Sequence, residues 1–396
     1  MEPVPPPEIL TRQANFQQLL SEAGIELALI RQAADLYYYS GIIVDGFLAL
    51  GSDGDPVLLV RRPHHRLQEQ ELPYPVAFYR DMKEIPSILS QLGLGHYGAI
   101  GLEMDVMPAV LYRRVQEKLF PNRPILDLAP LIRRQRMVKS PYEINQIRRA
   151  AHILDEALAA AAAVIKPGLT ELELAAELEY RLRLAGHQGL VRTRTWNLEM
   201  FFGHILSGAA GLQAAYVDTP SGGTGFSHGF PQGAGTKPLA PGEPISVDIA
   251  ACVNGYIADE TRMYVIGDLP PTAWQALDLV ENLFGLYEAA ARPGVMPADL
   301  YDRLFAEVTA AGLQDRFMGL GKDRVAFLGH GVGLELDEFP ILGPRFPYPL
   351  AADMVIAFEP KFFLPDIGMV GFEDTGRITP TGVEWLTRNP RQVWQI

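Results

Sequence analysis

The chain has 396 residues, a length that favours two domains over a single core. Its 34 lysines and arginines against 47 aspartates and glutamates give a formal charge of −13, which argues against nucleic-acid partners and against binding to an anionic membrane surface. A single cysteine, Cys252, excludes a disulfide framework, and the N-terminal residues lack the pattern of a signal peptide, so we expect a cytoplasmic protein.

Helices and strands alternate along the first 136 residues. Helical spacing runs from Ile9 to Ala23, and a short apolar strand follows at 25–30. The turn residues 52–55 lie between two apolar runs and predict a hairpin. Further helices are expected near 82–92 and 107–119. This segment therefore predicts a mixed α/β domain, in which we recognise no catalytic constellation.

Two clusters in this segment have structural interpretations. The three tyrosines at 37–39 are expected in a core or an interface. The basic stretch 61–66, which contains His64 and His65, is expected to be a surface patch or a rim on the substrate side, because no acid of matching spacing accompanies it.

A basic stretch ending at Arg136 marks the boundary between two predicted domains, residues 1–136 and 137–396. Ser140-Pro141-Tyr142-Glu143 is a capping box with proline at the first helical position, and it predicts a helix that runs to about Ile165. A second box begins at Thr170 and predicts a helix ending near Gly186.

The second predicted domain contains the same dipeptides at corresponding helix ends in its two halves. Pro293-Gly294 echoes Pro167-Gly168, and Ala311-Gly312 echoes Ala185-Gly186 at the same separation along the chain. A fixed offset across a whole helix predicts an internal duplication.

Acidic residues and a histidine recur inside apolar, strand-like runs of the last third of the chain, and the five are Asp248, Asp259, His330, Glu359 and Glu373. Burying an unpaired carboxylate is costly, so inward-facing acids indicate cations or a paired network. We expect no lysine to be their partner, and two divalent ions would balance four carboxylates. Oxygen ligands with one imidazole suit Mn²⁺, Co²⁺, Fe²⁺ or Zn²⁺. Two such ions can hold a bridging hydroxide and polarise a carbonyl, and both functions are needed for amide hydrolysis.

His228 lies in a glycine-rich loop, 20 residues before Asp248, and His330 lies 29 residues before Glu359 in the second half. Because the five ligands contain one imidazole, His228 is left as a candidate proton shuttle or oxyanion donor.

Residues 137–379 resemble the pita-bread metallopeptidases, and the N-terminal segment with the join at 136–140 resembles their creatinase/prolidase branch. The resemblance implies an α+β fold with an N-terminal creatinase/prolidase-type α/β domain and a pita-bread catalytic domain with an internal pseudo-two-fold repeat. It also implies a homodimeric, dinuclear peptidase that hydrolyses Xaa-Pro bonds in dipeptides or short peptides. Mn²⁺ or Co²⁺ is expected ahead of Zn²⁺ or Fe²⁺, with two ions per chain.

The family's pattern implies a role for each ligand. Asp248 would chelate one ion, His330 and Glu359 the other, and Asp259 and Glu373 would bridge them. Glu359 would also help to deprotonate the attacking water. His228 matches the histidine that contacts the scissile amide.

Two positions depart from the pattern. Asp337 stands where the peptidases carry a histidine, as a compensating acid or as plain loop polarity, and Gly371 stands where they carry an arginine. These departures leave open a hydrolase or lyase acting on a small non-peptide substrate, such as a small amide, or a non-catalytic binding relative. Arg262 is expected to brace the metal-binding carboxylates without binding a metal itself, and His204 either lines the substrate pocket or is a buried histidine.

Overall fold

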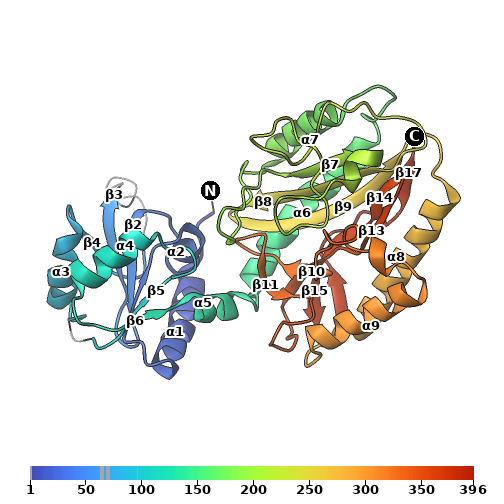
Figure 1. The fold of residues 1–396 in the computed structure, drawn as a ribbon. Helices are drawn as coiled ribbons and strands as arrows, with labels where there is room; N and C mark the ends of the chain where they lie inside the picture. The colour runs from blue at the N-terminus through green and yellow to red at the C-terminus, as the bar shows by residue number, and fades with distance from the viewer. Residues whose placement is uncertain (1, 63–66, 68–71, 96) are drawn as a thin grey trace. The chain divides into compact units, whose positions relative to one another are not determined.

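The computed structural model describes residues 2–62, 67, 72–95 and 97–396, so the predicted basic patch around His64 and His65 lies largely outside the described residues. The chain divides into two compact units, Met1–Arg136 and Met137–Ile396 (Figure 1). Within the described residues, no helix is both long enough and apolar enough to cross a membrane.

The first unit is built on a six-stranded sheet with the order β4-β3-β2-β1-β5-β6. The predicted hairpin is the antiparallel pair β2–β3, and the pairs β1–β5, β5–β6 and β3–β4 are parallel. The strands are β1 (Leu27–Ile30), β2 (Asp45–Gly51), β3 (Val57–Arg62), β4 (Val76–Phe78), β5 (Ile100–Leu102) and β6 (Ile125–Asp127). The helices are α1 (Pro6–Glu22), α2 (Ala33–Ser40), α3 (Ile85–Gln91), α4 (Ala109–Arg114) and α5 (Ala129–Arg136).

The tyrosine cluster belongs to helix α2. The side chains of Tyr38 and Tyr39 are buried, and the Tyr39 ring packs 4.7 Å from the ring of Phe16 on α1. These two tyrosines are therefore core residues of the first unit. Helix α2 ends at Gly41, whose φ of 72° lies in the left-handed region that glycine adopts without strain.

The second unit contains four long helices. Both predicted capping boxes form: Ser140 caps α6 (Pro141–Ala161), and Thr170 caps α7 (Glu171–Ala185). Helix α6 ends four residues before the predicted end at Ile165. The other two helices are α8 (Pro271–Ala290) and α9 (Pro297–Ala310).

A nine-stranded sheet of the second unit shows the predicted internal repeat. Its main path is β11-β10-β12-β15-β9-β8-β7, so the antiparallel trios β7-β8-β9 and β10-β12-β15 meet at the β9–β15 seam. A helix pair, α6–α7 or α8–α9, precedes each trio along the chain. These strands are β7 (Gly203–Ser207), β8 (Ile245–Val253), β9 (Tyr256–Val265), β10 (Gly329–Gly331), β11 (Glu338–Ile341), β12 (Val355–Phe358) and β15 (Glu373–Thr379).

Three further pieces complete this unit. β16 (Gly382–Trp385) pairs with β15, and β17 (Val393–Gln395) pairs with β9. A separate antiparallel hairpin consists of β13 (Lys361–Leu364) and β14 (Gly368–Gly371).

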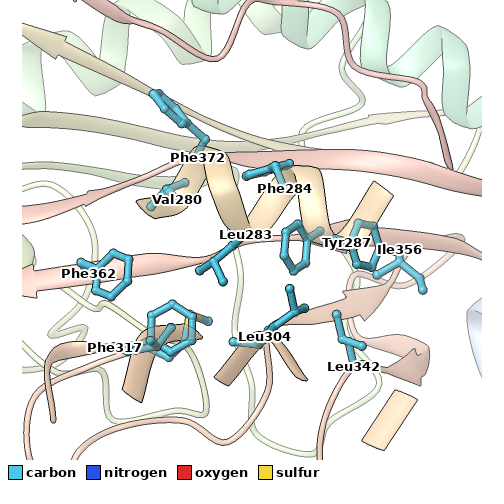
Figure 2. Packing of buried hydrophobic residues seen from close by; sticks show 14 of the residues in the cluster. Val280, Leu283, Phe284, Tyr287, Leu304, Phe317, Leu342, Ile356, Phe362 and Phe372 are labelled. Carbon is cyan, nitrogen blue, oxygen red and sulfur yellow. The ribbon is translucent and has the colours of Figure 1, made fainter. Parts of the chain in front are cut away.

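An aromatic core positions the end of β12. The ring of Tyr287 stacks on Phe358 with centroids 4.2 Å apart, and the ring of Phe284 meets Phe358 edge-on at 4.9 Å. Figure 2 shows Phe284 and Tyr287 among the other side chains of this cluster, including Leu304 and Ile356. Since Phe358 directly precedes Glu359, this packing fixes the backbone that presents Glu359.

We expect the substitution Phe284→Ala to lower the free energy of unfolding by about 3–5 kcal/mol, because it leaves a cavity among fully buried rings. Urea unfolding measures the change. Phe226→Ala is the matched control, since the Phe226 side chain is exposed. Equal stabilities for the two variants would contradict the assigned core.

Candidate metal centre

The sheet register places four of the relevant side chains in one row across neighbouring strands. His204 on β7 lies opposite Asp248 on β8, and Asp248 lies opposite Thr261 on β9. Thr261 in turn lies opposite Glu373 on β15. Directly opposed residues project to the same face of a sheet, so this row lies on one face.

A second row runs beside the first on the same face. Asp259 is two residues from Thr261 on β9, and Thr375 is two residues from Glu373 on β15, so alternation turns both to that face. Ala357 on β12 is paired with Thr375 and with His330 on β10. The register thus brings His330 from the second half toward Asp259 from the first.

Arg262 lies on the opposite face of β9. Its guanidinium contacts the carboxylates of Glu260 at 2.9 Å and Asp374 at 2.6 Å, and it donates to the backbone carbonyl of Glu373 at 2.8 Å. Arg262 therefore braces the strand that carries Glu373 and not the carboxylates of the centre, which differs from the sequence-based expectation. Strand alternation is the reason, because Arg262 is an odd number of positions from Asp259.

An imidazole nitrogen faces three carboxylates in the centre. His330 Nε2 lies 3.7 Å from Glu359 Oε1 and 4.0 Å from both Asp259 Oδ2 and Glu373 Oε1. Glu373 Oε1 is buried and has no hydrogen-bond partner among the described atoms. His330 Nδ1 lies 3.3 Å from the carbonyl oxygen of Gly331, an arrangement that leaves Nε2 free as a ligand when Nδ1 carries the proton.

These residues fit one divalent ion. The ligand atoms of Asp259, His330 and Glu373 all lie within 4.8 Å of one another, and the orphaned carboxylate oxygen needs a cation. Carboxylate oxygens with one imidazole nitrogen suit Mn²⁺, Co²⁺, Fe²⁺ or Zn²⁺.

The other side of the centre holds a lysine that the sequence-based reasoning missed. Lys361 Nζ lies 2.8 Å from Asp248 Oδ2, 2.8 Å from Glu359 Oε2 and 3.1 Å from Glu373 Oε2. The expectation that no lysine pairs with these acids is therefore wrong. The available signal was Lys361 itself, two residues after Glu359 and followed by the apolar run 362–364.

Burial and mutual charge shift the pKa values of the centre in opposite directions. Burial alone would lower the pKa of Lys361, but Asp248, Glu359 and Glu373 outweigh it and raise that pKa well above the usual value. Burial acts to raise the pKa of Asp248, but Lys361 outweighs it and lowers that pKa. Burial, with Asp248 nearby, raises the pKa of Asp259 to about 7. Burial, with Asp259 nearby, raises the pKa of Glu373 well above its usual value. Burial and neighbouring carboxylates thus make ionisation of Asp259 and Glu373 unfavourable unless a further cation is present.

The two further candidate histidines differ in their surroundings. His204 is buried, its Nε2 has no hydrogen-bond partner among the described atoms, and burial lowers its pKa. His228 is exposed in the loop between β7 and β8. Strand β7 is the counterpart of β10 in the repeat, so His204, and not His228, corresponds in position to His330.

Asp337 holds a loop. Its carboxylate accepts from the backbone N–H of Arg194 at 2.6 Å, and from the backbone N–H and hydroxyl of Thr195 at 2.8 and 2.5 Å. The neighbouring Glu338 accepts from Lys139 Nζ at 2.8 Å. These contacts support the interpretation of Asp337 as a loop residue over that of a compensating acid at the metals.

Known proteins resemble this chain in sequence and in fold. Residues 12–138 match the creatinase/prolidase N-terminal domain, and residues 145–380 match metallopeptidase family M24. The Xaa-Pro dipeptidase of Pyrococcus furiosus is 27% identical over 383 residues, which span 96% of this chain and 99% of that protein.

Two solved structures show the same fold along nearly the whole chain. The prolidase of Pyrococcus horikoshii has a TM-score of 0.79 at 24% identity and covers 96% of this chain and 99% of its own. The X-Pro aminopeptidase of Thermotoga maritima has a TM-score of 0.79 at 24% identity and covers 97% and 99%. The two-domain α+β fold predicted from the sequence is confirmed.

We expect Asp337→Ala to lower the free energy of unfolding by about 1–3 kcal/mol, because two backbone N–H groups lose their charged acceptor. The affinity for a divalent ion should stay unchanged, and calorimetric titration together with thermal unfolding measures both quantities. Asp302→Ala, at an exposed position of α9, serves as the control. A loss of metal affinity in Asp337→Ala would instead place this acid in the centre.

Proposed function

The chain belongs to metallopeptidase family M24, and on this premise we propose that it hydrolyses Xaa-Pro bonds in dipeptides or short peptides with the help of a divalent ion. The observation that supports the proposal most directly is the set of three buried carboxylates, from Asp259, Glu359 and Glu373, that face the half-buried His330 and include an orphaned oxygen. A non-catalytic binding relative has no evident need for such a set.

Each residue of the centre has its own role in this proposal. Asp259, His330, Glu359 and Glu373 would hold the ion, which when bound lowers the pKa of a coordinated water and polarises a substrate carbonyl. Glu359 Oε2 is held by Lys361, while Oε1 faces His330. The help that the resemblance predicts from Glu359 in deprotonating the attacking water stays a prediction. The contact that the resemblance predicts between His228 and the scissile amide stays a prediction.

The choice of an Xaa-Pro bond rests on the relatives and on local chemistry. The relative from Pyrococcus furiosus is an Xaa-Pro dipeptidase and matches this chain over almost its full length. An Xaa-Pro bond is a tertiary amide without an N–H, so its recognition depends on packing against the proline ring. Phe201 offers such a surface beside His204, with ring centroids 6.1 Å apart, and Phe230 lies 5.5 Å from Phe201.

A second candidate keeps the fold but changes the substrate. Lys361 places a fixed ammonium among the predicted ligands, and this observation is the ground for a second candidate, a hydrolase or lyase that acts on a small non-peptide substrate. The identity of the ion, the homodimeric state and the cytoplasmic location stay predictions from the sequence.

We expect removal of divalent ions with EDTA to abolish hydrolysis of Ala-Pro, and Mn²⁺ or Co²⁺ to restore it. His330→Ala should lower kcat/KM by about 100-fold or more, because it removes the imidazole ligand. Amino-acid release from Ala-Pro and from Ala-Ala, at equal metal loading, measures both the metal dependence and the proline preference.

His152→Ala is the control, since His152 is exposed on α6 and far along the chain from the predicted ligands. A metal-loaded protein that cleaves no Xaa-Pro peptide but does turn over small amides would overturn the first proposal and support the second.

A further inference from the structure

Lys361 differs from every residue that the resemblance assigns to the centre, because it brings a positive charge of its own. We infer that its ammonium group takes the place of one of the two predicted divalent ions, so that the chain binds a single ion. The ion would be held on the side of His330, by Asp259, Glu359 and Glu373 as well. The inference rests on the proposed function only in requiring that the chain binds a divalent ion.

The contacts of Lys361 divide the centre into two cation positions. An ammonium group has three N–H donors, and Nζ has three carboxylate acceptors within 3.1 Å, one each from Asp248, Glu359 and Glu373. Both glutamates turn their second oxygen, Oε1, toward His330 Nε2. Each glutamate thus bridges Lys361 and the His330 side. Asp248, which was expected to chelate an ion, accepts from the ammonium instead.

The fold has a place built for this side chain. Lys361 is 1% exposed and lies opposite Gly371 in the β13–β14 hairpin. A Cβ atom at Gly371 would lie 2.8 Å from both Cα and Cγ of Lys361 and 2.5 Å from the carbonyl oxygen of Pro360. Any larger residue at 371 would therefore collide with the lysine, so the absence of a side chain there and the presence of the lysine form one feature.

The backbone of Lys361 is fixed as well. Its carbonyl oxygen accepts from the backbone N–H of Met318 at 2.9 Å, and the next residue, Phe362, is paired with Phe317. Phe362 belongs to the core shown in Figure 2. The ammonium is therefore positioned by a packed strand, unlike that of a lysine on a mobile surface segment.

A second ion does not fit while Lys361 stays in this position. Metal–oxygen bonds of about 2.0–2.2 Å to the same three carboxylates would put the ion where Nζ lies. Two divalent ions beside an ammonium would also bring three cations together in a site that water barely reaches, where their repulsion is weakly screened. One divalent ion and one ammonium instead balance three of the four negative charges of the carboxylates, so the centre keeps one net negative charge. A neutral water ligand does not change this charge.

The number of ions bound per chain tests the inference. We expect the wild-type protein, saturated with Mn²⁺ and desalted, to carry one ion per chain by elemental analysis. Lys361→Ala removes the ammonium and leaves space beside four carboxylates, so we expect two ions per chain. Lys139→Ala is the matched control, because Lys139 is also buried and ion-paired, with Glu338, and it should leave one ion bound. Two ions in the wild type, or one in Lys361→Ala, would overturn the inference.

Asp248→Asn gives a second readout that does not depend on the folding of the Lys361 variant. An asparagine oxygen can still accept from the ammonium, but one negative charge is lost, so the affinity for Mn²⁺ in a calorimetric titration should fall by no more than about tenfold. His330→Ala should lose about 100-fold or more in affinity. A comparable loss in Asp248→Asn would show that Asp248 binds the ion and would overturn the inference.

Failure of the inference and failure of the proposed function give different results. A wild-type protein that binds one ion but cleaves no Xaa-Pro peptide defeats the function and leaves the inference standing. A wild-type protein that binds two ions and cleaves Ala-Pro overturns the inference and supports the proposed function. A protein that binds no ion overturns both.

Discussion

Buried negative charge on both faces of the β9–β15 seam is the constraint on which the second unit depends. On one face, Glu260 and Asp374 pair with Arg262, which is itself fully buried, and Asp374 also pairs with Arg391. On the other face, four acids from both halves of the repeat meet, and Lys361 neutralises only part of their charge. Isolated buried carboxylates are too costly to persist, so the two halves can join at this seam only with cations on each face.

The fold was predictable because its signals are local. Capping boxes at Ser140 and Thr170 place two helices, and the repeated Pro-Gly and Ala-Gly pairs expose the duplication before any contact is known. The repeat of the histidines could not be found in the same way. His204 reaches the centre through strand register, and a long segment separates β7 from β8, so spacing along the chain pointed to the exposed His228 instead.

The acids and the lysine show the same limit within the site. Asp248, Asp259 and Glu373 could be predicted as neighbours because each lies in a strand of a recognisable antiparallel pattern. Lys361 belongs to another strand pair, β13–β14, and reaches the centre from outside the main sheet. Pro360 interrupts the strand between Glu359 and Lys361, so alternation alone does not tell which way the lysine points.

A cation that is part of the chain is in place as soon as the chain folds, whereas a metal ion must first bind from solution. Lys361 is held by the β13–β14 hairpin and the Phe317–Phe362 pairing, so it reaches Asp248, Glu359 and Glu373 as the chain folds. Both glutamates then already present Oε1 toward His330 before any ion binds. Such preorganisation reduces the cost of ordering ligands around the remaining ion. The same lysine removes the flexibility that a second exchangeable ion would bring, and this ties the chemistry of the centre to one metal position.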